Sequence, residues 1–127
     1  MGSPEKIDPI YNWAIQIGSM LRNRGTDKST IANILSQFQS LSDPREAALL
    51  TMMYIRRQIG RGEINKYAGS NLIQILNKLY NDYYNDAEKL RTNILKFLVL
   101  MKWAYESELR REIKDFNEFI EYIAKER

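Results

Sequence analysis

The chain of 127 residues contains no cysteine and no histidine. The lack of cysteine excludes disulfides, thiolate metal sites and cysteine nucleophiles. The lack of histidine removes the commonest general base and the commonest metal ligand. No run of about 18 apolar residues occurs, so we expect no membrane-spanning helix. The opening stretch MGSPEKID has no apolar core, which predicts no signal peptide, and we expect a cytoplasmic protein.

An enzyme built from this chain would have to use Asp, Glu, Lys, Tyr or Ser alone. Glu108 and Glu112 stand four residues apart with Arg111 between them, which is typical of a solvated ion-pair face rather than a magnesium site. The GRG stretch at residues 60–62 lacks the preceding strand and the GK[ST] ending of a phosphate-binding loop. We therefore predict that the chain is not an enzyme and that it uses no metal, no cofactor and no small-molecule substrate.

Apolar residues recur at intervals of three and four along most of the chain, and no segment reads as a credible strand. Proline at the start of two such segments and glycine at their ends mark helix boundaries. The predicted helices cover residues 9–24, 28–41, 44–60, 70–84, 87–111 and a last segment from about 116. We predict an all-α fold in which residues 1–127 form one domain, a single compact bundle of five to six helices. Residues 1–7 are expected to be a disordered N-terminal segment.

Three of these helices carry further expectations. The helix at 44–60 has apolar residues almost all the way round, so it is either central or exposes part of its surface to a partner. The run Phe97–Met101 has no polar break, which places the middle of its helix at the bundle centre. The last helix has a narrow apolar stripe that either packs back on the bundle or docks on another subunit. This stripe consists of Phe116, Phe119, Ile120 and Ile123.

Charge is unevenly distributed, although the net charge is only +3. From Arg22 to Lys102 there are 13 basic and 7 acidic residues, whereas residues 103–127 contain 5 basic and 7 acidic ones. A basic body with a mildly acidic tail fits a polyanionic partner on one side of the molecule. An uneven but merely solvated surface is the alternative.

The densest basic cluster is YIRRQIGRGEINKY, at residues 54–67. Basic residues near a helix C-terminus complement the helix macrodipole, which explains one or two members of this cluster. An arginine doublet followed by a third arginine between glycines favours contact with phosphate, because the planar guanidinium holds phosphate through two hydrogen bonds. A solvated turn that needs soluble residues is the alternative. The predicted phosphate contacts are Arg56, Arg57, Arg61 and Lys66.

A second cluster, RNRGTDK, surrounds the predicted helix joint at Gly25. The macrodipole explanation is stronger here, because Arg22 and Arg24 fall in the last turn before the glycine. We retain Arg22, Arg24 and Lys28 as candidate phosphate contacts.

Several aromatic side chains can in principle stack on bases. Their helical spacing inside apolar faces favours core or interface positions instead, so recognition of the nucleic-acid backbone is predicted rather than recognition of bases. These residues are Tyr80, Tyr83, Tyr84, Trp103 and Tyr105.

Three stretches, in this order, resemble one protein family: DKSTIANILSQFQ, LLTMMYIRRQIGRG and ILKFLVLMKWAYES. They are similar to a Thr/Ser-rich helix entry, a leucine-rich helix running into Tyr and Gly-Arg, and an apolar helix closing on an Ala-Tyr pair. Together they resemble the small subunit of type III-A CRISPR interference complexes, the Csm complex, over about Thr26 to Ser107. The chain departs from the family pattern at Ala32, where an arginine is expected, and at Glu106, where a basic residue is common.

The resemblance implies a non-catalytic helical subunit that stacks in copies and contacts other CRISPR effector subunits. Such a subunit supports the backbone of guide RNA paired with target RNA, and the match places Tyr54, Arg56, Arg57 and Arg61 at the functional joint. Two alternatives stay open. One is a helical protein–protein interaction module without nucleic-acid binding, and the other is the small subunit of another CRISPR class, contacting single-stranded DNA.

Overall fold

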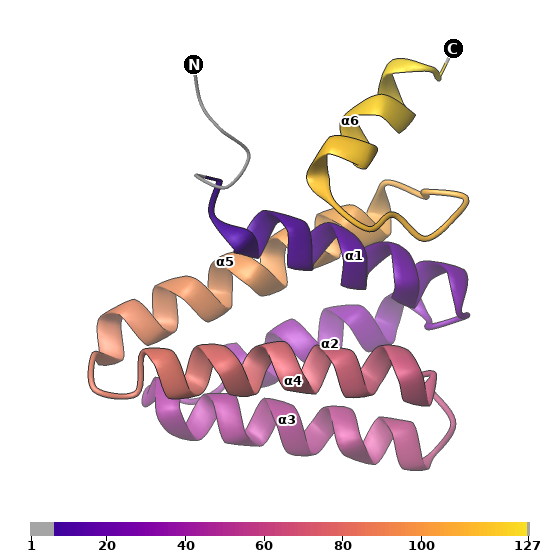
Figure 1. Ribbon diagram of the computed structural model, residues 1–127. Coiled ribbons are helices and arrows are strands. Elements are labelled where there is room, and N and C mark those ends of the chain that lie inside the picture. The colour runs from indigo at the N-terminus through magenta and orange to yellow at the C-terminus, as the bar shows by residue number, and fades with distance from the viewer. Residues whose placement is uncertain (1–6, 127) are drawn as a thin grey trace.

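The computed structural model describes residues 7–126, and within that range the chain forms six helices and no strand (Figure 1). The helices are α1 (Pro9–Asn23), α2 (Lys28–Gln39), α3 (Pro44–Gly60), α4 (Lys66–Asp82), α5 (Ala87–Glu106) and α6 (Phe116–Ala124). The predicted all-α bundle is therefore confirmed. Of the segment 1–7 that we expect to be disordered, residues 1–6 lie outside the described residues, and Ile7 forms an exposed bend before α1.

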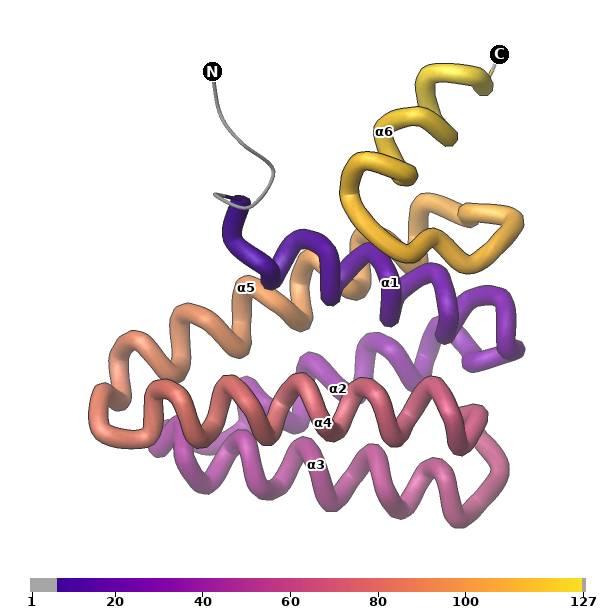
Figure 2. Tube along the Cα trace, in the orientation of Figure 1, coloured from indigo at the N-terminus to yellow at the C-terminus, as the bar shows by residue number. Residues whose placement is uncertain are grey.

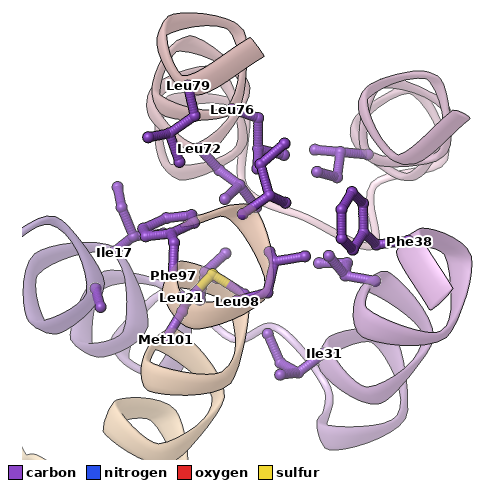
Figure 3. Packing of buried hydrophobic residues seen from close by; sticks show 14 of the residues in the cluster. Ile17, Leu21, Ile31, Phe38, Leu72, Leu76, Leu79, Phe97, Leu98 and Met101 are labelled. Carbon is purple, nitrogen blue, oxygen red and sulfur yellow. The ribbon is translucent and has the colours of Figure 1, made fainter. Parts of the chain in front are cut away.

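Helix α5 is the centre of the bundle, because it packs against α1, α2, α3 and α4. Figure 3 shows its residues Phe97, Leu98 and Met101 among side chains from α1, α2 and α4. All three are almost completely buried, as the unbroken apolar run predicts. Burial of these large apolar side chains away from water stabilises the packing of α5 against its neighbours.

Two predicted helix boundaries were wrong. Helix α4 begins at Lys66 rather than near residue 70, because the side chain of Asn65 accepts a hydrogen bond from the Ala68 N–H at 3.0 Å and caps the helix. Helix α5 ends at Glu106 rather than near residue 111. Glu108 adopts a left-handed φ of 54°, which turns the chain back toward α1.

Helix α3 lies at an edge of the bundle and exposes part of its apolar surface (Figure 1). Its side chains Leu49, Leu50 and Met53 face solvent, and Met53 is 73% exposed. Of the two expectations for this helix, an exposed apolar surface is thus the one observed, and a partner for that surface stays a prediction. These three residues are called the α3 apolar face below.

Helix α6 extends away from the other five helices and contacts α1 (Figure 2). Its predicted apolar stripe is divided between two environments. Phe116 and Phe119 pack against a small second core, whereas Ile120 and Ile123 are exposed. The helix therefore packs back on the bundle with one half of the stripe.

Helices α1 and α5 approach each other closely at Gly18. A Cβ atom at this position would lie 2.5 Å from the Cβ of Ala104 and 2.6 Å from the carbonyl oxygen of Met101. Because the nearest atoms belong to a short side chain and to backbone, no flexible group can move aside. Gly18 thus sets the distance between the central helix and the helix that ends at the first basic cluster.

Replacing Gly18 with alanine should lower the free energy of unfolding by about 1–3 kcal/mol, which urea denaturation measures. The cost of forcing a methyl group between the two helices is larger than the stability that alanine adds through its higher helix propensity. The matched control is Gly60→Ala at the end of α3, where a Cβ would meet no atom within 4 Å and φ is not positive. That variant should be as stable as the wild type or slightly more stable. Equal stability of the two variants would contradict the close approach.

Candidate nucleic-acid interface

The turn between α1 and α2 presents the first basic cluster. Gly25 has a φ of 85°, and the Thr26 N–H donates to the Leu21 carbonyl at 3.1 Å, which closes α1 with a left-handed glycine. The hydroxyl of buried Tyr105 donates to the Thr26 carbonyl oxygen at 2.5 Å. The backbone of this turn is therefore fixed to α5, while Arg24 and Lys28 remain on the surface.

The turn between α3 and α4 is built in the same way. Gly62 has a φ of 77°, and the Glu63 N–H donates to the Gln58 carbonyl at 2.9 Å. Ile64 is buried directly after it, and a Cβ at Gly69 would lie 2.5 Å from Ile59, so the two helices are held closely together. The tight, anchored turn leaves its basic side chains at the surface.

Arg24 connects the two turns. Its Nη1 lies 3.4 Å from Oδ1 of Asn65, and its guanidinium carbon lies 4.8 Å from the centre of the Tyr67 ring. Figure 1 shows both turns on the same side of the molecule. The structure thus brings the two predicted clusters to one end of the bundle. We call this region the basic end: Arg22, Arg24, Lys28, Arg56, Arg57, Arg61 and Lys66.

Residues 107–115, between α5 and α6, contribute acidic side chains to the basic end. Glu112 accepts two hydrogen bonds from Arg24, at 2.7 and 3.3 Å, and this pairing raises the pKa of the Arg24 guanidinium. Glu108 lies 3.6 Å from Arg22. Two of the seven predicted phosphate contacts are therefore already paired with a carboxylate. This pairing leaves no local signal in the sequence, because each glutamate meets an arginine from a distant part of the chain.

The same segment is anchored to α1 by buried contacts. The hydroxyl oxygen of Ser19 accepts a hydrogen bond from the Ile113 N–H at 2.9 Å, and the Asn23 amide donates to the Leu109 carbonyl at 3.0 Å. Farther along, Glu118 accepts hydrogen bonds from the Lys114 N–H and from the Arg111 side chain, and both lower the pKa of its carboxyl. These contacts fix where Glu108 and Glu112 stand.

Five members of the basic end form no ion pair with a residue in the described range 7–126. They are Lys28, Arg56, Arg57, Arg61 and Lys66, and all five are exposed. Arg57 makes one weak contact, 3.4 Å to the side-chain oxygen of Gln58. Asp27 and Glu63 lie in the same two turns, and Glu108 and Glu112 pair with Arg22 and Arg24. The seven basic residues still outnumber these four acidic ones, and such a surplus attracts polyanions.

Within residues 7–126, no three Asp or Glu side chains converge into a group able to hold a metal ion. No helix in that range is apolar over a sufficient length to span a bilayer. The expectations of no enzymatic activity and no cofactor stay predictions.

The chain matches no protein-family description, no curated protein and no solved structure. The resemblance to the CRISPR small subunit and the assignment of the seven basic residues therefore stay predictions.

Replacing Ser19 with alanine should loosen residues 107–115, because the buried Ile113 N–H loses its partner at a cost of about 1–3 kcal/mol. Urea denaturation measures the loss, and hydrogen exchange should be faster for amides in that segment. Ser36→Ala, at an exposed position on α2, serves as the control and should change stability by less than about 0.5 kcal/mol. Similar behaviour of both variants would show that Ser19 does not anchor the segment.

Proposed function

We propose that this chain is a non-catalytic small subunit of a cytoplasmic CRISPR RNA-guided interference complex, acting in antiviral defence. In this proposal the basic end binds the backbone of guide RNA paired with target RNA. One observation carries it: two turns distant in sequence place five exposed basic side chains, none of them in an ion pair within residues 7–126, at one end of the bundle. The resemblance described above supplies the biological setting.

The geometry favours contact with the backbone of the nucleic acid. Lysine and arginine that meet phosphates release condensed counterions, a sequence-independent source of affinity. Arg56 and Arg57 project from the last turns of α3, and Arg61 follows at its C-cap, so the three are close in space. Their anchored turn limits the conformational entropy lost on binding.

The α3 apolar face supplies a surface for neighbouring subunits in this proposal. Leu49, Leu50 and Met53 lie on the same helix as Arg56 and Arg57. A contiguous exposed apolar patch is typical of a protein interface. A subunit that stacks in copies would thereby repeat its few phosphate contacts along the RNA, and affinity would come from assembly.

Replacing Arg56, Arg57 and Arg61 together with alanine should reduce the salt dependence of RNA binding. Each phosphate contact contributes about 0.9 to the slope of log K against log salt for a double helix and about 0.7 for a single strand, so the slope should fall by about two to three units. Fluorescence anisotropy with a labelled RNA duplex and with a labelled oligouridylate at several salt concentrations measures this change.

The control removes the same number of charges elsewhere, with Lys78→Ala, Lys89→Ala and Lys125→Ala at exposed positions outside the basic end. The control should bind as the wild type does. An equal loss of RNA affinity in both variants would show that only the net charge matters. That result would contradict the assignment of Arg56, Arg57 and Arg61 as phosphate contacts. A parallel titration with single-stranded DNA tests the other CRISPR class, which predicts tighter binding of DNA.

The second candidate function is a protein–protein interaction module, favoured by the α3 apolar face. Replacing Met53 with lysine should abolish self-association, which sedimentation velocity measures. A charge buried at the centre of an interface loses its hydration, and this costs free energy. The exposed position predicts unchanged stability. An interaction module would lose association with Met53→Lys yet show no RNA binding in any variant. A Met53→Lys chain that associates as the wild type does would exclude this face.

A further inference from the structure

A pocket lies at the basic end, where α1, the start of α4 and residues 107–115 meet. Its volume is about 520 Å³, which is within the range of small-molecule binding sites. Met20 and Ile113 form the apolar part of the lining, and Gln16 adds an amide. Its walls come from three separate segments, so no local sequence pattern indicates this pocket.

The charged side chains of the pocket mark the position of an anion. Arg24, Lys114 and Glu112 all line it, and Glu112 holds the guanidinium of Arg24 through two hydrogen bonds. A carboxylate and a phosphate bind the same bidentate fork of an arginine. Glu112 therefore occupies the place in which a phosphate oxygen pair would fit. The carboxylate is at the surface, so moving its side chain aside leaves the anchored backbone unchanged.

Tyr67 contributes an aromatic wall to the same pocket. The side chain stays 58% exposed even though the Arg24 guanidinium lies over its ring. Aromatic rings at the surface of single-strand binding sites stack on bases regardless of sequence. Tyr67 is not among the aromatic residues named above as able to stack on bases.

We propose that this pocket binds one unpaired nucleotide of RNA at its rim, with the base stacked on the face of Tyr67 that Arg24 leaves open and the phosphate replacing Glu112 on Arg24. Lys114 then provides a second positive charge for the same phosphate. The inference rests on the proposed function and adds a site for a base to a surface otherwise suited to phosphates. Glu112 weakens binding in this arrangement, because it competes with the incoming phosphate for the guanidinium.

The first test compares Tyr67→Ala with Tyr67→Phe on a labelled oligouridylate and on a fully paired RNA duplex. Loss of stacking should weaken binding of the single strand by about tenfold in Tyr67→Ala. Tyr67→Phe keeps the ring and should stay within about twofold of the wild type. Neither variant should change binding of the duplex, whose bases are not free to stack. Equal weakening for single strand and duplex would contradict a base site.

The second test compares Glu112→Gln with Glu121→Gln, which removes the same charge from an exposed position on α6. Glu112→Gln should bind the oligouridylate more tightly, because the phosphate no longer has to displace a carboxylate from Arg24. Arg24 then adds a full phosphate contact, which should steepen the slope of log K against log salt by about 0.7. Glu121→Gln should do neither. Identical gains in affinity in both variants would show that only the net charge matters. That result would contradict the replacement of Glu112 by a phosphate on Arg24.

The two proposals fail in different ways. If the triple arginine variant loses binding while the variants at Tyr67 and Glu112 match the wild type, the pocket inference is wrong and the proposed function stands. If the triple arginine variant also binds as the wild type does, both are wrong.

Discussion

The close contact of α1 with α5 at Gly18 is the constraint on which the rest of the structure depends. Helix α5 buries Phe97, Leu98 and Met101 at the centre of the bundle, and at Gly18 α1 lies so close to α5 that no space remains for a side chain. Protein interiors are packed as densely as organic crystals, so a contact of this kind fixes the position of a whole helix. The position of the last turn of α1 follows directly from it.

That last turn then organises the basic end. Ser19 and Asn23 hold residues 107–115 against α1, and Arg24 reaches across to Asn65 and Tyr67. Packing in the core is thereby connected to the surface through two hydrogen bonds between side chains of α1 and the backbone of residues 107–115, which are buried or partly buried. The side chains at the surface contribute little to stability, because exposed ion pairs are typically worth about 0–1 kcal/mol. They are thus free to exchange partners without unfolding the domain.

Much of the fold could be predicted from the sequence, because helix formation leaves local signals. Asp8, Asp43 and Asp86 cap their helices, and the apolar run of α5 is buried. The end of α5 could not be predicted, since Leu109 and Ile113 turn back to bury themselves against residues near the N-terminus. Both basic turns were visible in the sequence. Their meeting through Arg24, and its pairing with Glu112, arise from contacts between distant segments and leave no local signal.

The central claim is that RNA meets the chain at the basic end, and backbone amide chemical shifts during an oligouridylate titration test it most directly. The account predicts that the largest shift changes fall in residues 22–28 and 56–67, the two turns joined by Arg24. Amides of Leu49 and Leu50, the members of the α3 apolar face about two helical turns before Arg56, should change little. Saturable changes confined to that face or to α6, with the two turns unaffected, would contradict it.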